Sequence, residues 1–471
     1  MSIVKESVSL RPESKAPSAV GSGAPAVTRG ASWLTPWPLI CKLCHTHAPA
    51  GPTAICAQCL GPLEPVAPAN RLLPNRETIG RRAPNLWRYR EWLPFTALAA
   101  ATATFDAKGN RQTSRTLQPT DPFTAPLSPD TGFTPLVDAP RLAARLGVAR
   151  CWIKNDAVSH PSLSFKDRVV TAAINAAHAF GIQTIGCAST GNLANAVAAH
   201  AARAGLPAWI FIPHDLELGK VVGTQVYNPH LVRIRGHYDD VNRLCAQVAD
   251  AFGWGIVNVN LRAYYGEGSK TIAFEIAEQL GWRLPTAVIA PMAGGSLVSK
   301  LGKGFHEITD ARLAFGTHPR IYGAQAAGCA PIVNLVHSSD EQITPVIPNT
   351  IARSIAIGNP ADGPFAKHAI LGSGGTAIAV SDADLVAGIR LLAEDTGVFT
   401  ETAGGVTVAG AVALAAQGAF GPDDELVLCI TGNGLKTIEA ITDPAYGPVP
   451  DAPVIAPRLR EVRALVEARH S

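Results

Sequence analysis

From about residue 131 onward, the chain alternates short apolar runs with longer Ala-rich runs in which apolar residues recur at helical spacing. Short apolar runs are typical of buried strands, and longer runs with a period near 3.6 indicate amphipathic helices. Strands are expected at 208–212, 231–234, 255–259, 287–290, 320–323 and 426–430. Helices are expected at 169–179, 192–204, 239–252 and 270–280. The alternation predicts an α/β fold with parallel-type sheets flanked by helices.

The two ends of the chain depart from this pattern. Residues 1–36 are rich in Ser, Ala, Gly and Pro and show no hydrophobic period, so they predict a flexible tail. A compact cysteine block follows at 41–59. Residues 457–471 place their apolar side chains on one helical face, which predicts a terminal helix packed on the body of the protein.

Composition narrows the class of protein. The chain has 40 basic and 37 acidic residues, and this near balance argues against a protein that coats nucleic acid or an anionic membrane. No apolar run reaches the roughly 18 residues of a membrane helix, and the N-terminus lacks the apolar segment of a secretory signal. The cysteines outside 41–59 lie singly in apolar stretches, as reduced thiols do. We expect a cytoplasmic protein without a membrane or nucleic-acid partner.

Lys166 stands out in the run Ser164-Phe165-Lys166-Asp167-Arg168, at the start of an apolar helix. Most lysines are solvated, and a solvated Lys in a first turn is the simpler interpretation. Cations are disfavoured at a helix N-terminus, however, so this lysine needs another reason to be there. An amine that combines with an aldehyde cofactor would provide that reason.

The run Ser189-Thr190-Gly191-Asn192 leads from an apolar stretch into the next Ala-rich helix. Ordinary helix capping explains one hydroxyl residue here. Two hydroxyls and the free N–H groups of the helix start could instead hold a carboxylate. The run is longer than one cap requires, and we favour the binding interpretation.

Two glycine-containing turns follow expected strands, at 291–297 and 430–436. The first could present backbone N–H groups to a phosphate, and the second could direct the Thr431 hydroxyl into a cleft. Each turn alone is weak, since glycine turns after strands are common. The first turn has neither the spacing of a P-loop nor that of a dinucleotide fingerprint.

Together these runs resemble the pyridoxal-phosphate (PLP) enzymes of fold type II, and among them the threonine synthase family. The resemblance spans about 85–445 and rests on motifs in family order: 164–168, 188–192, 349–355, 400–405 and 431–436. It implies a two-lobed α/β enzyme. The expected parts are the tail at 1–36, a zinc-ribbon-like module at 37–66, a large PLP-binding domain from 67–168 and 285–456, a smaller inserted domain at 169–284, and a C-terminal helix at 457–471.

By resemblance, Lys166 is the catalytic residue, joining the cofactor aldehyde and moving protons. Asn192 would bind the phenolic oxygen of the cofactor, and Thr431 would face its pyridine nitrogen. The cofactor phosphate would lie in the loop formed by Ala293, Gly294, Gly295, Ser296 and Leu297.

The substrate would be held by a second set of residues. Ser189 and Thr190 would contact its carboxylate, and Asn260, Arg262 and Lys270 would contact its phosphate. Arg suits phosphate because its guanidinium offers a planar fork of donors. Apart from the resemblance, a solvated loop after a strand explains the last three residues equally well. Leu163 departs from the family pattern, which has Gly before the Ser-Phe-Lys motif.

Four cysteines, Cys41, Cys44, Cys56 and Cys59, form two pairs with the spacing of knuckles that bind one zinc ion. Free reduced thiols, or a site that has lost its metal, are the alternatives. A closed set of four thiolates has no open position for water, so a zinc ion here would be structural.

The resemblance implies a lyase of threonine biosynthesis that converts O-phospho-L-homoserine and water to L-threonine and phosphate by PLP-dependent γ-elimination and β-hydration. The alternatives are another fold type II enzyme, a threonine dehydratase or a cysteate synthase, and a non-catalytic homologue that binds a partner through its zinc module. The oligomeric state is left open, with a homodimer as one option.

Overall fold

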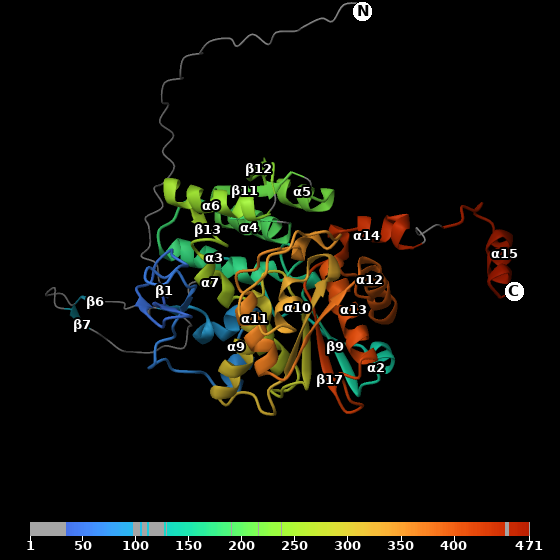
Figure 1. Cartoon of the computed structure of the whole chain (residues 1–471), viewed down its shortest axis with the longest axis horizontal. Coiled ribbons are helices and arrows are strands. Elements are labelled where there is room, and N and C mark those ends of the chain that lie inside the picture. Colours follow the sequence, from blue (N-terminus) through green and yellow to red (C-terminus); the bar gives the residue numbers. More distant parts are fainter. Residues whose placement is uncertain are drawn as a thin grey trace, which may run out of the picture. The chain divides into compact units, whose positions relative to one another are not determined.

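The computed structural model describes residues 34–97, 104–105, 111–112, 127–128, 130–189, 191–214, 216–236, 238–447 and 452–470 (Figure 1). Residues 1–33 of the expected tail lie outside this range. Its last three residues form a strand, β1 (Leu34–Pro36), which pairs antiparallel with β5 (Phe95–Ala97). This part of the tail prediction was wrong, because local composition cannot reveal a partner strand so far along the chain.

The larger sheet has six strands in the order β16-β15-β14-β17-β9-β8. Their bounds are β8 (Leu136–Asp138), β9 (Arg150–Asn155), β14 (Ala287–Pro291), β15 (Arg320–Ala326), β16 (Ala377–Val380) and β17 (Glu425–Ile430). All neighbours pair in parallel except β8 and β9, which are antiparallel. The sheet therefore confirms the predicted α/β class and adds an antiparallel edge strand.

Side chains of β14 alternate between two hydrophobic cores. Ile289 packs with the core under helix α13 (Thr402–Ala416), and Val288 and Ala290 pack with the core under α9 (Ser296–Asp310). Successive residues of a strand point to opposite faces of its sheet. Helices therefore cover both faces, and this is why the sequence of these strands is apolar throughout.

The second sheet has four parallel strands in the order β12-β11-β10-β13. Their bounds are β10 (Ile185–Ala188), β11 (Ala208–Pro213), β12 (His230–Ile234) and β13 (Gly255–Ile256). Helices α3 (Lys166–Ala179), α4 (Asn192–Ala204) and α6 (Tyr238–Phe252) supply its packing partners. This sheet lies wholly within the segment expected as the inserted domain, whose boundaries at 169 and 284 remain a prediction.

The cysteine block folds as a small antiparallel sheet in the order β3-β2-β4, with bounds β2 (Leu39–Cys41), β3 (His47–Ala48) and β4 (Leu63–Pro65). The remaining strands are β6 (Thr104–Phe105) and β7 (Arg111–Gln112). The remaining α-helices are α1 (Arg76–Gly80), α2 (Pro140–Leu146), α5 (Leu218–Gln225), α7 (Arg262–Glu267), α8 (Thr271–Gln279), α10 (Pro331–Val336), α11 (Gly363–Gly372), α12 (Asp382–Thr396), α14 (Glu439–Thr442) and α15 (Leu459–His470).

The terminal helix α15 forms as predicted but does not bury its apolar face. Leu459, Val462 and Val466 are 66%, 46% and 50% exposed. The prediction that this helix packs on the body was therefore wrong, since an amphipathic pattern does not specify whether a partner surface exists. Across the described ranges, no helix combines the length and apolar character needed to span a bilayer.

Candidate active site

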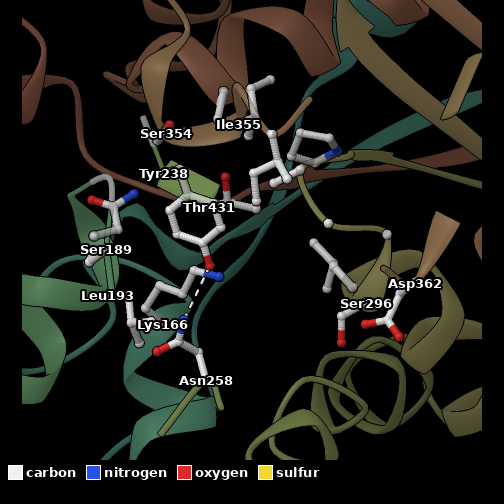
Figure 2. Close-up of a pocket in the computed structure, with 18 of the residues that line it drawn as sticks. Lys166, Ser189, Leu193, Tyr238, Asn258, Ser296, Ser354, Ile355, Asp362 and Thr431 are labelled. Carbon is white, nitrogen blue, oxygen red and sulfur yellow. Dashed lines mark hydrogen bonds between the residues drawn. The ribbon is translucent and has the colours of Figure 1, made fainter. Parts of the chain in front are cut away.

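A cavity of about 200 Å³ lies where the carboxyl ends of strands from both sheets meet. Ser189 follows β10, the turn at 293–295 follows β14, and Thr431 follows β17; all of them line it. Figure 2 shows Ser189, Lys166 and Thr431 around this space, with Ser296 and Asp362 on its other side in this view. In α/β folds, ligands bind at such strand ends because the loops there are free to carry polar groups.

Lys166 is the first residue of α3, and its amine faces the cavity. Its Nζ donates a hydrogen bond to the Tyr265 hydroxyl over 3.1 Å. Burial lowers the pKa of Lys166 to about 8, with the charge of Glu401 acting in the opposite direction. A lysine with a lowered pKa keeps a sizeable neutral fraction near neutral pH and can act as a nucleophile.

The amide of Asn192, the first residue of α4, is held in one orientation. Its Nδ2 donates to Glu401 Oε1 over 2.6 Å, and its Oδ1 accepts from Lys436 Nζ over 3.2 Å. Lys436 donates equally to Asn195 Oδ1, also over 3.2 Å. Because Lys436 can only donate, the carbonyl side of Asn192 must face it and the NH₂ group must face Glu401.

The turn between β14 and α9 has the form of an anion cradle. Gly294, Gly295 and Ser296 line the cavity, as do the flanking Ala293 and Leu297. Gly295 has φ +89°, and a Cβ there would lie 2.8 Å from the carbonyl oxygen of Asp362. Only glycine fits this position, and the first N–H groups of α9 have no partner within the helix. Together these features suit a phosphate group.

Ser189 caps a helix as well as lining the cavity. Its Oγ accepts hydrogen bonds from the backbone N–H groups of Gly191 and Ala194, both over 2.9 Å. The capping interpretation therefore holds for this hydroxyl, which still has its own proton to donate to a ligand. Thr190 lies outside the described residues.

Of the three residues expected at the substrate phosphate, the structure brings one to the cavity. Arg262 lines the cavity and pairs with Asp362 over 2.7 Å. Asn260 instead binds local backbone, accepting from Ile256 N and donating to the Trp254 carbonyl oxygen.

Lys270 is also away from the cavity. It is fully buried and pairs with Glu267 over 2.6 Å and with Glu307 over 2.8 Å. Its charge is already compensated by two carboxylates, so nothing remains to attract a substrate anion. The expectations for Asn260 and Lys270 are corrected accordingly.

Several cavity residues were not singled out from the sequence. Tyr238, Asn258, Tyr265, Ser354 and Glu401 all line the cavity. Glu401 Oε2 and Ser354 Oγ are buried without a hydrogen-bond partner among the described residues. Glu401 and Ser354 fall inside motifs used for the resemblance, so the signal was present, but their roles depend on contacts across the cavity.

These features fit a phosphorylated aldehyde cofactor such as PLP. The cavity has a reactive amine at Lys166, a glycine turn at Gly295 and a neutral hydroxyl at Thr431. It also has buried polar atoms at Glu401 and Ser354 without a hydrogen-bond partner among the described residues. Buried polar atoms without partners are costly, and a bound polar ligand would satisfy them.

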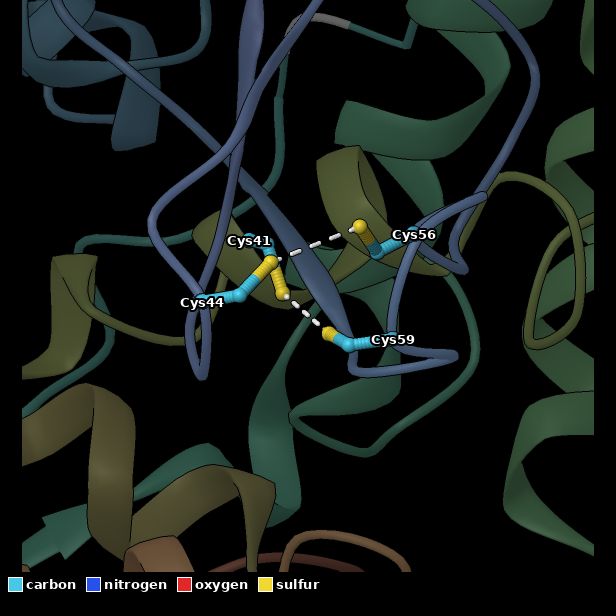
Figure 3. Close-up of side chains that lie close together, drawn as sticks. All are labelled: Cys41, Cys44, Cys56 and Cys59. Carbon is cyan, nitrogen blue, oxygen red and sulfur yellow. Dashed lines mark hydrogen bonds between the residues drawn. The ribbon is translucent and has the colours of Figure 1, made fainter.

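The four cysteines converge in space (Figure 3). Their Sγ atoms all lie within 4.8 Å of one another, with Cys41 and Cys59 3.4 Å apart and Cys44 and Cys56 3.7 Å apart. Four thiolates on one zinc ion, each with a bond of about 2.3 Å, would lie about 3.8 Å apart. The cluster can therefore hold a metal ion.

Comparison with known proteins agrees with this geometry. The model of the family described as "Pyridoxal-phosphate dependent enzyme" matches residues 127–432. Maize serine racemase superposes with a TM-score of 0.56 at 21% identity, covering 65% of this chain and 91% of that chain. The processed form of threonine deaminase isoform 2 from Solanum lycopersicum gives 0.56 at 22% identity, covering 67% and 89%. At these identities, both similarities concern the fold alone.

Two curated relatives are more similar in sequence. Threonine synthase from Methanocaldococcus jannaschii is 32% identical over 377 residues, which cover 80% of this chain and 86% of the relative. Threonine synthase from Synechocystis is 38% identical over 310 residues, which cover 65% and 77%.

The fold, the cavity and the match to the family model together define the class of protein. It is an α/β enzyme that depends on pyridoxal phosphate. Within that class, the chain belongs to the threonine synthase family and is a lyase. The fold type II architecture expected from the sequence is confirmed.

Proposed function

We propose that the protein converts O-phospho-L-homoserine and water to L-threonine and phosphate. The observation that carries the proposal is one cavity that combines the Lys166 amine with two places suited to phosphate, the Gly295 turn and Arg262. One phosphate belongs to the cofactor and the other to the substrate, so a phosphorylated substrate accounts for both.

Four parts of the cavity would hold the cofactor. Lys166 would join its aldehyde, and the 293–297 turn would bind its phosphate through backbone N–H groups. The Asn192 NH₂ group would donate to its phenolic oxygen, and the Thr431 hydroxyl would face its ring nitrogen. When bound, PLP supplies an electron-withdrawing ring that lets a proton leave the substrate's α-carbon.

The chain's own residues would then position the substrate and move protons. Ser189, with Thr190, would donate hydrogen bonds to the substrate carboxylate. The Arg262 guanidinium would exchange part of its pairing with Asp362 for the substrate phosphate. Lys166 would take the α-proton and return protons at later steps. One amine at the start of a helix can exchange protons with several atoms of the substrate, because the substrate is held in a fixed position beside it.

The proposal includes a zinc ion bound by the four cysteines, with a structural role. The sulfur spacing supports it, and four ligands would leave no position for substrate or water. Metal analysis of the purified protein should find about one zinc ion per chain. A Cys44→Ser variant should lose the metal, whereas a Cys245→Ser variant, altered at a buried thiol outside the cluster, should keep it.

A cytoplasmic location and assembly as a homodimer complete the proposal. The location is supported by the described cysteines, none of which forms a disulfide. Analytical ultracentrifugation tests the assembly, and a single species at the mass of one chain would refute it.

The deciding experiment supplies purified holoenzyme with phosphohomoserine and measures phosphate and threonine together. Equal amounts of both products are expected. Ammonia with a 2-oxo acid would indicate a dehydratase instead, and turnover of phosphoserine would indicate a cysteate synthase. A Lys166→Ala variant should lose both turnover and the visible absorption band, near 410–420 nm (roughly), of cofactor bound to the lysine. A wild-type protein without that band would point to a non-catalytic homologue.

A further inference from the structure

The four-cysteine module contributes no residue to the cavity, yet it is packed against the elements that do. We propose that this module (residues 37–66) is a positioning element of the active site, which holds helix α7 and the start of α9 in place. Helix α7 carries two cavity residues, Arg262 and Tyr265. The inference rests on the proposed function only for the identity of the substrate, not for the cofactor.

The first contact is made by Tyr264, which is fully buried beside Tyr265. Its hydroxyl donates to the Trp37 carbonyl oxygen over 2.9 Å and accepts from Gly51 N over 3.3 Å. Its ring also stacks on Phe95 of β5, outside the module, with centroids 6.4 Å apart. Successive residues of a helix point about 100° apart, so one face of α7 is held by the module while the next residue faces the cavity.

The second contact is a partly buried charge network. Glu64, on β4 of the module, pairs with Lys300 over 3.2 Å and Lys303 over 3.1 Å, both on α9. Both lysines also pair with Glu267, the last residue of α7. Burial alone would raise the pKa of Glu64, but Lys300 and Lys303 lower it to about 2, so the carboxylate stays charged. The network thus joins the module, α7 and α9 in one place.

The third contact comes from Lys42, between the first two cysteines. Its Nζ lies 3.4 Å from the centre of the Phe365 ring, close to Asp362. Asp362 is the partner of Arg262, and its carbonyl oxygen lies against Gly295. A cation over an aromatic face is an attractive contact. Lys42 therefore fixes the segment on which both phosphate-binding places depend.

All three contacts reach elements or segments that carry cavity residues: α7 with Arg262 and Tyr265, α9 with Ser296, and the segment of Asp362. A positioning role therefore predicts an effect on the cavity as well as on stability. A shift of about 1 Å in a group that orients a substrate can reduce turnover by roughly a hundredfold. A metal on the four thiolates would fix the two knuckles relative to each other, and with them Lys42 and the strand that carries Glu64.

The test uses full-length holoenzyme carrying Glu64→Gln, which keeps the shape of the side chain and removes its charge. We expect the KM for phosphohomoserine to rise roughly tenfold. We also expect the pH midpoint of the absorption band of cofactor bound to Lys166 to shift, because Tyr265 moves with α7. Zinc content should be unchanged. The matched control is Glu77→Gln, at an exposed ion pair on α1 that touches neither module nor cavity.

A lower melting temperature with wild-type KM and wild-type pH midpoint would overturn the proposal, because a purely structural role predicts that result. Should Glu64→Gln fail to fold, Tyr264→Phe removes only one hydroxyl, and the same two measurements apply to it. The absorption band does not depend on the substrate. A shifted band in a protein that makes no threonine would therefore refute the proposed function while supporting the positioning role.

Discussion

Lys166 Nζ donates a hydrogen bond to the hydroxyl of Tyr265 over 3.1 Å, and this contact joins two helices that line the cavity. Lys166 begins α3, and Tyr265 lies on α7. Burial raises the pKa of Tyr265, so its phenol stays protonated and neutral. The amine thus has a fixed and uncharged acceptor beside it. This acceptor orients the amine without favouring its protonated form as a carboxylate would.

Replacing Tyr265 by Phe should remove this orientation of the amine and leave the packing of the ring. We expect kcat/KM for phosphohomoserine to fall roughly tenfold, which corresponds to the loss of one hydrogen bond of about 1.4 kcal/mol. Steady-state kinetics measures the effect. Tyr322→Phe is the matched control, because Tyr322 does not line the cavity and donates to the Ala419 carbonyl oxygen. Equal activity of both variants would contradict the role of Tyr265.

The pH dependence of cofactor uptake should report the pKa of Lys166. Only the neutral amine attacks an aldehyde, and burial lowers the pKa of Lys166 to about 8. The rate at which apoprotein combines with PLP should therefore rise with pH and level off above about 8.

A Glu401→Gln variant should shift that midpoint to lower pH. The carboxylate of Glu401 raises the pKa of Lys166, so its removal favours the neutral amine at any given pH. Stopped-flow absorbance measures both proteins. A midpoint that stays in place or moves upward would show that Glu401 does not act on the amine.

Lys436 should matter for cofactor affinity although it does not line the cavity. In a Lys436→Met variant, Asn192 Oδ1 loses its donor, and the amide is free to turn its NH₂ group away from the cofactor. We expect the dissociation constant for PLP to rise roughly tenfold in a spectrophotometric titration of apoprotein. Lys367→Met is the control, a buried lysine that binds backbone carbonyl groups instead. Comparable losses in both variants would indicate general destabilisation.

Leu163 adopts φ +59°, a left-handed conformation that costs a non-glycine residue about 1–2 kcal/mol. Its N–H and carbonyl groups bond Ser159 and Asn433, which hold it there. The side chain is 38% exposed, so its removal also gives up part of a buried apolar surface. The relief of backbone strain offsets this loss and the greater freedom of glycine in the unfolded chain, so Leu163→Gly should change the free energy of unfolding by less than about 1 kcal/mol in urea.

The same substitution at Leu435 lacks the compensating relief of strain. Leu435 is 65% exposed and is not among the residues with positive φ, so glycine relieves no strain there. We expect Leu435→Gly to destabilise by about 0.5–1 kcal/mol, because glycine has more freedom to lose on folding. A Leu163→Gly variant destabilised by more than about 2 kcal/mol would show that the buried part of the leucine side chain outweighs the strain of its backbone.

The sequence by itself determined the features that depend on neighbours along the chain. Alternating apolar runs determined the α/β class, and the start of a helix after Ser164 determined the place of Lys166. The spacing of Cys41, Cys44, Cys56 and Cys59 determined a metal-binding arrangement. Periodicity, capping and spacing act over a few residues, so they can be read without knowledge of the fold.

Only the tertiary structure decided which polar residues face the cavity. Asn260 hydrogen-bonds to local backbone, and Lys270 pairs with two glutamates. Arg262, which lies between them in sequence, lines the cavity. The pairing of Lys166 with Tyr265 joins residues far apart in sequence. A polar side chain can be satisfied by any nearby partner, and the choice depends on which distant segments the packed sheets bring next to it.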